Sequence, residues 1–397
     1  MIINVLVIGG GMYVSGRHTD GFGTILPALF GLFEDHMVNS IGLVVTRQQS
    51  LDMLKEKVYK LSREMNLNPK VFYFINPITE SEYRKIIDFY HFNVSIIAVP
   101  DNLHCVISSL LMNLGLHCMV VKPMSPTYEE SLHMTKVAES NNVVAEVEFH
   151  KRLDQSNQVL HNYLKKEALG TLLYSVVEYS QPKFIPRDVF SGWSKETNIF
   201  QYLGVHYVDL LLFITGYFPK KVTAWGQKSY LASISIDTYD SIQVVIEWES
   251  PNKEVTFVST HITSWVDPDT SSSISDQKIS IVGSKGKMIL DQKNRGIQAV
   301  FDNSGVKDIN PYFTQEIIST EGTLKFSGYG IDNIRQFFVD IILFEEGQIS
   351  LAELDIKRPT FKSCLLSSAV IEAASLSLEK SNQTIEVKDI CELATVI

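Results

Sequence analysis

Short apolar runs alternate with longer amphipathic stretches over the first 148 residues. The apolar runs are rich in β-branched residues and predict six strands: INVLVI (3–8), IGLVV (41–45), VFYFI (71–75), VSIIAV (94–99), HCMVV (117–121) and VVAEVE (143–148). Helical segments of roughly 12 to 17 residues separate them. Continuous apolar strands that alternate with helices predict an α/β domain with a parallel sheet covered on both faces, most commonly the doubly wound Rossmann fold.

The pattern changes after about residue 151. A predicted helix at 155–169 precedes strands in which apolar and polar positions alternate: LLYSVVEYS (172–180), KVTAWGQ (221–227), SIQVVIEWE (241–249), VTFVSTHIT (255–263), KISIVG (278–283) and KMILD (287–291). This alternation is typical of a large, mostly antiparallel open sheet with one solvated face. GSKG (283–286) predicts a hairpin turn, residues 267–276 a polar loop, and the stretches 331–346 and 362–380 predict helices.

Two domains follow from these patterns, because 397 residues exceed the size of one ordinary hydrophobic core. We expect a dinucleotide-binding domain at 1–148 and an α+β domain at 149–397 that binds substrate and mediates oligomerisation. The helix near 361–380 is a candidate for packing back onto the first domain.

Composition narrows the function classes. The chain is 45% apolar and 20% charged, and its net charge of −10 is spread along the sequence. This balance favours a globular protein that binds neither nucleic acid nor an anionic membrane. The four cysteines (Cys105, Cys118, Cys364 and Cys391) lack metal-binding spacing, which predicts free thiols and a reducing, cytoplasmic location, with no metal site. The N-terminal MIINVLVIGG has no basic residue before its apolar run, so it predicts a strand rather than a signal peptide.

Three consecutive glycines follow the first predicted strand. Gly9-x-Gly11 at a strand end allows a tight turn and a close approach to a pyrophosphate, so we assign Gly9, Gly11, Met12 and Tyr13 to cofactor binding. Val14 stands where the fingerprint G-x-G-x-x-G has its third glycine, so an ordinary loop is the alternative.

A P-loop is a second interpretation of the same glycines. Gly11-x-x-x-x-Gly16 is followed by Arg17 and His18, where the P-loop requires a lysine and a hydroxyl residue. Because both positions lack the required side chain, an NTPase is the weaker hypothesis.

The end of the second strand bears on which cofactor is bound. Thr46 and Arg47 stand where an NAD-binding protein usually has a carboxylate for the ribose 2′-hydroxyl. A basic residue accommodates a 2′-phosphate, so NADP is favoured over NAD, unless Arg47 is simply solvated.

Polar residues also follow the fourth and fifth strands. Ligands of open parallel sheets bind beyond the carboxyl ends of strands, so we assign Pro100, Asn102, His104 and Lys122 to the cofactor site. Lys122 is followed by Pro123, and a lysine at this place could lie beside a nicotinamide and transfer a hydroxyl proton. As an isolated dipeptide, Lys-Pro is more often only a strand exit.

An ordered set of motifs resembles the Gfo/Idh/MocA family of NAD(P)-dependent oxidoreductases. The motifs are the glycine turn at 9–11, VPDNLH (99–104), VVKP (120–123), HKRLD (150–154), LGVHYVDLLLFITG (203–216) and IVGSKGKMILD (281–291). The resemblance implies a Rossmann domain followed by an open sheet that binds substrate and forms homodimers or homotetramers. It also implies that Lys122 is the active-site lysine and His206 its acid/base partner, during hydride transfer between nicotinamide and a carbinol carbon.

Three departures from the family pattern stand out. The family commonly has a glutamate before the lysine, where this chain has Val121, and an aspartate four residues before the histidine, where it has Tyr202. Val14 and an apparent insertion at 15–24 change the glycine turn. Asp209 lies three residues after His206, on the same helical face, and could orient its imidazole.

Candidate substrate contacts are Lys122, Arg152, Trp193, Tyr202 and His206, with Lys151 and Lys195 nearby in sequence. Aromatic faces with basic donors suit a polyhydroxylated or anionic sugar. The leading hypothesis is therefore an NAD(P)-dependent oxidoreductase acting on a sugar, sugar acid, nucleotide sugar or cyclitol. The alternative is a catalytically inactive nucleotide-binding sensor or scaffold of the same fold, motivated by Val121 and Tyr202.

Overall fold

A computed structural model describes residues 2–190 and 192–393, and the chain divides into two compact units. The first comprises Met1–Ser125, Glu130–Leu153 and Tyr312–Cys364. The second comprises Pro126–Glu129, Asp154–Pro311 and Leu365–Ile397.

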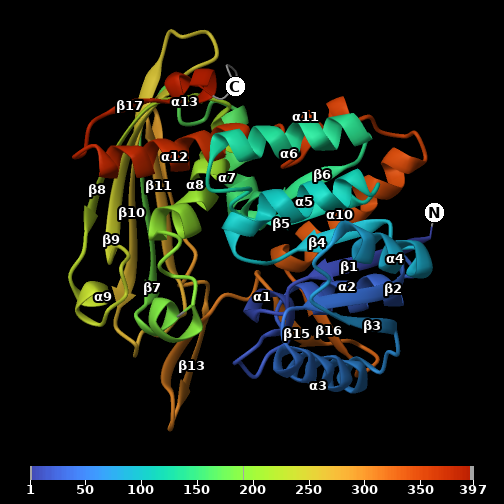
Figure 1. Ribbon diagram of the computed structural model, residues 1–397. Helices are drawn as coiled ribbons and strands as arrows, with labels where there is room; N and C mark the ends of the chain where they lie inside the picture. The colour runs from blue at the N-terminus through green and yellow to red at the C-terminus, as the bar shows by residue number, and fades with distance from the viewer. Residues whose placement is uncertain (1, 191, 394–397) are drawn as a thin grey trace. The chain divides into compact units, whose positions relative to one another are not determined.

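A six-stranded parallel sheet forms the centre of the first unit (Figure 1). Its strands are β1 (Ile3–Ile8), β2 (Val38–Val45), β3 (Lys70–Ile75), β4 (Val94–Ile97), β5 (His117–Val121) and β6 (Ala145–Glu148), in the order β3-β2-β1-β4-β5-β6. All neighbours pair in parallel, so the six predicted strands and the doubly wound sheet are confirmed. The strand order reverses between β1 and β4, which is where such sheets bind ligands.

Helices cover this sheet. They are α1 (Met12–Ser15), α2 (Ile25–Glu34), α3 (Gln48–Met65), α4 (Glu80–Tyr90), α5 (His104–Asn113) and α6 (Tyr128–Asn141), with the 3-10 turns η1 (Asp101–Leu103) and η2 (His150–Leu153). Leu51, Leu54, Val58 and Leu61 recur at helical spacing along α3 and are buried in the core of the unit. Helix α3 ends where Asn66 adopts a left-handed conformation.

A late segment of the chain returns to the first unit. It holds β15 (Gln315–Ile318), β16 (Leu324–Ser327), α10 (Tyr329–Glu345) and α11 (Leu351–Lys357). Ile334, Phe337, Phe338 and Ile341 of α10 are fully buried in the same core as α2. The boundary predicted at 148/149 therefore needs correction, because an apolar helix face shows that a helix is buried but not which core buries it.

A seven-stranded sheet forms the centre of the second unit. Its strands are β7 (Leu172–Pro182), β8 (Phe218–Gln227), β9 (Ser241–Glu249), β10 (Thr256–Asp267), β11 (Asp276–Gly283), β12 (Gly286–Asp291) and β17 (Ile385–Glu386), in the order β12-β11-β7-β10-β9-β8-β17. The pair β7 and β10 is parallel and the other pairs are antiparallel, so the predicted mostly antiparallel sheet is confirmed. Apolar and polar residues alternate along β9 because every second residue, from Ile242 to Trp248, is fully buried. The hairpin predicted at GSKG joins β11 to β12.

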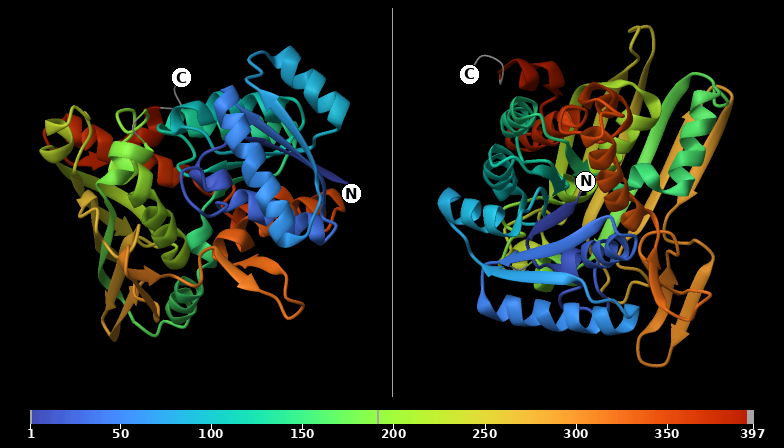
Figure 2. Two further views of the ribbon diagram at one scale, coloured as in Figure 1. Left: turned by 90° about the horizontal axis from the view of Figure 1, so that it is seen from below. Right: turned by 90° about the vertical axis from the view of Figure 1, so that its right-hand side faces the viewer.

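The remaining elements of the second unit are α7 (Gln155–Lys165), the π-helical turns η3 (Ile185–Val189) and η4 (Phe200–Gly204), α8 (Val205–Thr215), α9 (Tyr230–Ser233), the hairpin β13 (Ile297–Phe301) and β14 (Gly305–Ile309), α12 (Leu365–Glu379) and α13 (Val387–Leu393). Figure 2 shows the β13–β14 hairpin from two further sides. Helix α12 packs on β8 and α8, and its Ser377 hydroxyl accepts a hydrogen bond from the Ala224 N–H at 3.0 Å. The helix α12 thus belongs to the second unit, and its packing on the first domain stays a prediction.

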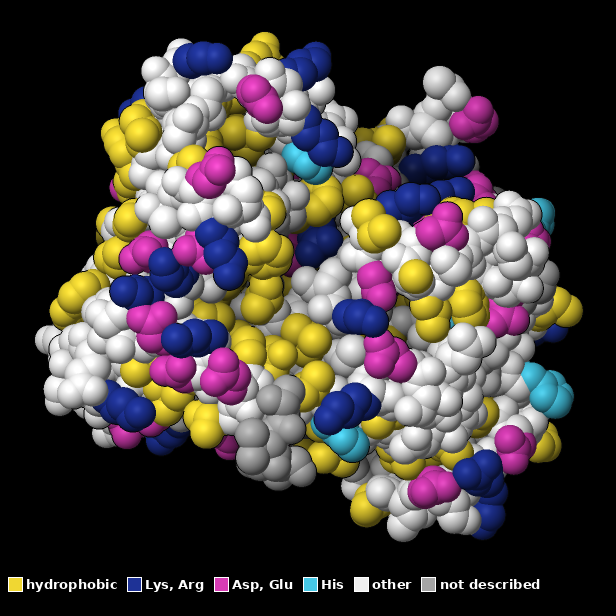
Figure 3. All heavy atoms as spheres, turned by 90° about the horizontal axis from the view of Figure 1, so that it is seen from above, with side chains coloured by type: hydrophobic (Ala, Val, Ile, Leu, Met, Phe, Trp, Pro, Cys, Tyr) yellow, Lys and Arg dark blue, Asp and Glu magenta, His cyan; other side chains and the backbone are white. Residues whose placement is uncertain are grey.

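Acidic and basic side chains are interspersed over the face of the molecule drawn in Figure 3. Among residues 2–190 and 192–393, no helix combines the length and apolar character needed to cross a membrane. All four cysteines are free thiols, as their spacing predicted.

Candidate active site

The glycine turn leads from β1 directly into α1. Gly9 has a φ of 121°, and a Cβ there would lie 2.2 Å from the carbonyl oxygen of Ala98, so only glycine fits. Gly11 is the N-cap of α1, and a Cβ there would meet no atom within 4 Å. The turn therefore leaves open space beside Gly11, as a bound pyrophosphate requires.

The residues between α1 and α2 form a closed loop rather than a helix start. A Cβ on Gly16 would lie 2.1 Å from the Gly21 carbonyl oxygen, and one on Gly23 would lie 2.7 Å from the Gly16 nitrogen. Lys57 of α3 donates hydrogen bonds to the carbonyl oxygens of Thr19 and Gly21 at 2.7 and 2.6 Å. The extension predicted at 15–24 is thus a compact loop, and the sheet-covering helix begins only at Ile25.

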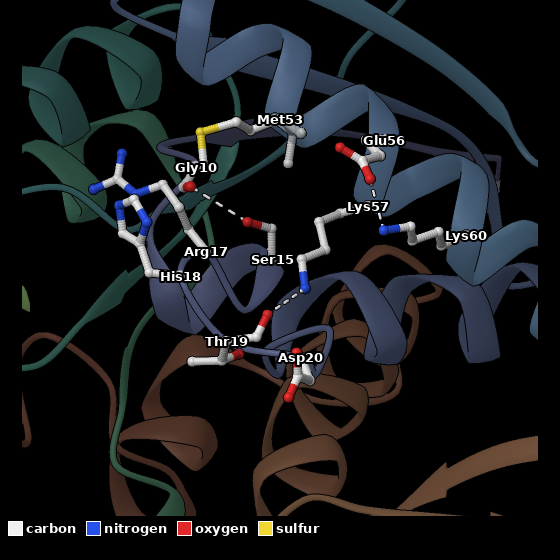
Figure 4. A pocket seen from close by; sticks show the side chains of 11 residues that line it. Gly10, Ser15, Arg17, His18, Thr19, Asp20, Met53, Glu56, Lys57 and Lys60 are labelled. Carbon is white, nitrogen blue, oxygen red and sulfur yellow. Dashed lines mark hydrogen bonds and ion pairs between the residues drawn. The ribbon is translucent and has the colours of Figure 1, made fainter.

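This loop and α3 line a pocket of about 240 Å³ (Figure 4). Arg17 and His18 extend side by side from the loop, whereas Lys57 points to the Thr19 carbonyl and Lys60 pairs with Glu56 at 2.6 Å. In a P-loop the corresponding basic and hydroxyl residues stand at the start of a helix. Arg17 and His18 lie in a loop instead, so the geometry does not support the P-loop hypothesis.

Thr46 and Arg47 are exposed at the carboxyl end of β2. Arg47 is the N-cap of α3, and its extended backbone starts the helix without a side-chain cap. The structure thus puts a guanidinium, and no carboxylate, immediately beyond β2.

The residues beyond β4 differ in their accessibility. Asp101 is buried and accepts a hydrogen bond from the Asn102 N–H at 3.0 Å, while Pro100 and Asn102 are exposed. His104 is fully buried, and its ring nitrogens lie 2.9 Å from the Pro123 carbonyl oxygen and 3.0 Å from that of Val99. Burial lowers the pKa of His104. Its ring holds the ends of β4 and β5 together, and direct contact with a cofactor would require it to leave this position.

Lys122 directly follows β5 and keeps a partly exposed side chain. Burial in its dense surroundings lowers the pKa of its amine from 10.5 to about 7, although the charges of Glu148 and Asp101 act in the opposite direction. A pKa near neutrality suits a group that must both accept and donate a proton.

Glu148, at the end of β6, is the residue that the sequence analysis missed. It is 2% exposed, and its Oε1 accepts a hydrogen bond from the Tyr13 hydroxyl at 2.7 Å. The Nδ1 of His150 lies 2.7 Å from the same oxygen. Burial, followed by the charge of Glu148, raises the pKa of Tyr13, so its phenol remains a donor. The strand pattern VVAEVE did contain an acidic residue at its end, which was the available signal.

Lys151 and Arg152 follow on η2 and are both buried. Lys151 disfavours the charged form of Lys122, while Arg152 acts on the buried carboxyl of Glu146 and has its Nη2 3.9 Å from the sulfur of Cys364. The substrate role of Arg152 stays a prediction.

In the second unit, His206 and Asp209 lie on α8 and are both buried. The ring of Tyr179 lies 6.2 Å from the His206 ring and 5.9 Å from that of Tyr207. The Tyr207 hydroxyl donates to Oε1 of Gln277 at 3.4 Å. His206 thus belongs to a cluster with the aromatic rings of Tyr179 and Tyr207.

Trp193 and Tyr202, two predicted substrate contacts, are neighbours in this unit. Their ring centroids are 5.5 Å apart, and Phe190 lies 5.1 Å from both. The Trp265 ring centroid lies 5.8 Å from that of Tyr202. Burial raises the pKa of Tyr202, so its hydroxyl stays protonated and can donate a hydrogen bond.

The predicted residues thus fall into two sets. The first unit brings together the glycine turn, Lys122 and Glu148, and the second brings together Trp193, Tyr202 and His206. That both sets of residues act on one substrate is a prediction.

Comparisons with known proteins bear on both sets. Residues 157–289 match the family model described as the GFO/IDH/MocA C-terminal domain. That segment is similar to the C-terminal domain of this family. The resemblance to the Gfo/Idh/MocA family inferred from the sequence motifs is thereby confirmed.

Two curated relatives are dehydrogenases. The chain is 28% identical over 130 residues to a UDP-N-acetylglucosamine 3-dehydrogenase of Acidithiobacillus ferrooxidans, which covers 33% of this chain and 38% of that protein. It is 27% identical over 143 residues to a levoglucosan dehydrogenase of Pseudarthrobacter phenanthrenivorans, which covers 35% of this chain and 37% of that protein. The matches thus span little more than a third of each relative.

Solved structures share the fold over nearly the whole chain. The scyllo-inositol dehydrogenase of Lactobacillus casei, solved with NAD(H) and scyllo-inositol, superposes with a TM-score of 0.66 at 15% identity. The superposition covers 98% of this chain and 100% of that one. At this identity the likeness concerns the fold alone.

Proposed function

We propose that the protein is an NAD(P)-dependent dehydrogenase acting on a hydroxyl group of a sugar, sugar acid, nucleotide sugar or cyclitol. The observation that carries the proposal is Lys122, whose amine has a pKa of about 7 and lies just beyond β5 of a sheet with the dinucleotide-binding strand order. The names of the relatives, which act on sugars and cyclitols, support a polyhydroxylated substrate.

The residues around the carboxyl ends of the strands fit a dinucleotide. The open space at Gly11 would receive the pyrophosphate, and the exposed Arg47 would lie near the adenosine ribose. We assign the cofactor to Gly9, Gly11, Met12, Tyr13, Thr46, Arg47, Pro100, Asn102 and Lys122. A nicotinamide, when bound, accepts or supplies the hydride at its C4.

In this proposal, Lys122 accepts and donates the proton of the substrate hydroxyl. When an alcohol is oxidised, the neutral amine takes the hydroxyl proton as the hydride leaves the carbinol carbon. When a carbonyl is reduced, the ammonium form returns that proton to the oxygen. His206 is its acid/base partner, and Arg152, Trp193 and Tyr202 contact the substrate.

The inactive sensor remains the second candidate. It was motivated by the missing carboxylate at Val121 and by Tyr202 in place of an aspartate. Glu148 weakens the first motive because it supplies a carboxylate whose charge acts on Lys122. Hydride transfer to or from any substrate would exclude this candidate.

Replacing His206 tests the proposed chemistry. In an assay of nicotinamide reduction with a panel of sugars, sugar acids, nucleotide sugars and cyclitols, we expect His206→Ala to lower kcat at least about 100-fold. His161→Ala is the control, because His161 lies in the same unit and packs on Phe213 of α8 at 4.6 Å. Full activity of His206→Ala on an identified substrate would show that His206 has no acid/base role.

Replacing Arg47 tests the preference for NADP. We expect Arg47→Ala to weaken NADPH binding by roughly 10-fold while NADH binding stays unchanged, because a guanidinium pairs with a 2′-phosphate. Titration by nicotinamide fluorescence measures both affinities, and Arg63→Ala at the far end of α3 is the control. Equal affinities of the unmodified protein for NADPH and NADH would contradict the preference.

We further propose that the protein forms a homodimer or homotetramer through the seven-stranded sheet. Large apolar side chains of this sheet are exposed, including Tyr174, Trp225, Val258, Ile262 and Ile289. Tyr174 and Val258 lie opposite each other in the register of β7 and β10, and adjoining exposed apolar side chains are typical of an interface.

A further inference from the structure

The carboxylate that is missing before Lys122 has a counterpart on the neighbouring strand. β5 and β6 pair in parallel, and Val121 lies directly opposite Glu148 in the register. Residues in register on adjacent strands project to the same side of a sheet, about 5 Å apart. The carboxyl group of Glu148 therefore lies on the same side of the sheet as a carboxyl group at position 121 would, one strand away.

The carboxyl group of Glu148 is held in place by two side chains. It is buried, and its two oxygens are satisfied by the Tyr13 hydroxyl at 2.7 Å and by Nδ1 of His150 at 2.7 and 3.0 Å. The His150 ring packs between aromatic rings, with the Tyr329 centroid at 5.5 Å and the Phe313 centroid at 5.0 Å. A buried carboxylate is costly unless it is hydrogen-bonded, and this arrangement meets that condition.

Charged and titratable groups surround Lys122 on several elements. Glu148 from β6 and Asp101 from η1 favour its ammonium form, and Lys151 from η2 opposes it. Glu148 is the largest of these charge effects. Nδ1 of His104 from α5 lies within hydrogen-bond distance of the carbonyl oxygens of Pro123 and Met124, the two residues that follow the lysine.

We propose that Glu148 is the positioning residue of the Lys122 site, taking the place of the glutamate that commonly precedes the lysine in the family. Its carboxylate stabilises the lysine from the adjacent strand, and Tyr13 ties the same carboxylate to the glycine turn. The assignment of Lys122 as the proton-transfer group rests on the proposed function, whereas the placement of Glu148 rests on the register and on its hydrogen bonds.

The link through Tyr13 distinguishes this arrangement from a glutamate at 121. Tyr13 belongs to α1, the one-turn helix whose N-cap is Gly11. A single carboxylate therefore contacts the turn assigned to the pyrophosphate and acts on the amine assigned to the chemistry.

The test measures the titration of Lys122 without substrate or cofactor. The full-length protein is labelled briefly with acetic anhydride at a series of pH values, and mass spectrometry gives the acetylation rate at Lys122. We expect the midpoint to lie near pH 7 in the unmodified protein. In Glu148→Gln it should fall by roughly one pH unit, because a nearby negative charge that favours the ammonium form is lost.

Further variants show whether the titration of Lys122 responds to a carboxyl group at this particular place or to any change of a buried glutamate. The exchange Val121→Glu with Glu148→Val should return the midpoint to within roughly half a pH unit of the original, while Glu148→Val alone should not. Glu146→Gln is the matched control. Glu146 is equally buried on the same strand, but its pKa of about 8 reflects burial and then Asp340, and it is not among the charges acting on Lys122.

An unchanged midpoint in Glu148→Gln, or a failure of the exchange to restore it, would overturn the proposal. If Glu148→Gln does not fold, Val121→Glu carries the test, since an added carboxylate at 121 should raise the midpoint. No shift in Val121→Glu would show that a carboxylate at that place does not reach the amine. These labelling results do not depend on hydride transfer, so a failure of the proposed function would be seen separately, in the activity and cofactor titrations.

Discussion

Lys122→Met is expected to lower kcat by at least about 100-fold while cofactor affinity changes little. Methionine has nearly the length of lysine and fills the same space, but it cannot accept or donate the hydroxyl proton. The measurement is steady-state hydride transfer on the substrate identified from the panel, with NADPH and NADH binding followed in parallel. Lys136→Met, an exposed position on α6, is the control. If Lys122→Met keeps full turnover, the proton passes to another group.

The pH dependence of this activity has a definite sign. Because the pKa of Lys122 is about 7, alcohol oxidation should accelerate as the pH rises through 7, where the amine becomes neutral. Carbonyl reduction should slow over the same range, because it needs the ammonium form. Both dependences should disappear in the residual activity of Lys122→Met.

The lowered pKa of Lys122 should also make the free energy of unfolding depend on pH. The folded pKa of about 7 lies below the unfolded value of 10.5, so between these pH values the unfolded chain binds a proton that the folded protein does not. The free energy of unfolding should therefore rise with pH across this window, by roughly 1–3 kcal/mol for a partly exposed amine. Denaturant unfolding at pH 7 and pH 10 should show this rise in the unmodified protein but not in Lys122→Met.

The two sheets could be predicted from local patterns because the apolar and polar positions within each strand show which of its faces are buried. INVLVI and HCMVV are continuous apolar runs buried on both faces, and SIQVVIEWE alternates because only one face of β9 is buried. The return of α10 to the first unit was not predictable in this way. Its apolar face would be buried equally well by either core, and only long-range packing decides between them.

The same distinction explains the candidate site. Gly9, Gly11 and Lys122 were identified because they stand next to strand ends, a position that is visible along the chain. Glu148 acts on Lys122 through the pairing of β5 with β6, and its bond to Tyr13 spans 135 residues. His104 is the opposite case, because its position along the chain was misleading. Its place after β4 suggested a ligand contact, but the fold turned its ring toward the Pro123 and Val99 carbonyls.

The two glycines at the end of β1 should respond very differently to alanine. Gly9→Ala introduces a Cβ 2.2 Å from a backbone oxygen, at a φ of 121° that L-residues rarely adopt. Neither the sheet nor the turn can move aside without breaking the pairing of β1 with β4. We expect the free energy of unfolding to fall by more than ~3 kcal/mol, and thermal unfolding measures this directly.

Gly11→Ala should leave the fold intact and affect the cofactor instead. Gly11 has a φ of −75°, which any residue adopts, and its Cβ would enter open space. Its unfolding should stay within ~0.5 kcal/mol of the unmodified protein. The added methyl group would occupy the space through which a pyrophosphate approaches the backbone, so cofactor affinity should fall by roughly 10-fold or more. If Gly11→Ala binds NADPH and NADH as tightly as the unmodified protein, the space beside Gly11 does not hold the pyrophosphate. The dinucleotide would then have to lie elsewhere, although Gly9 would still be required to let β1 pass close to the end of β4.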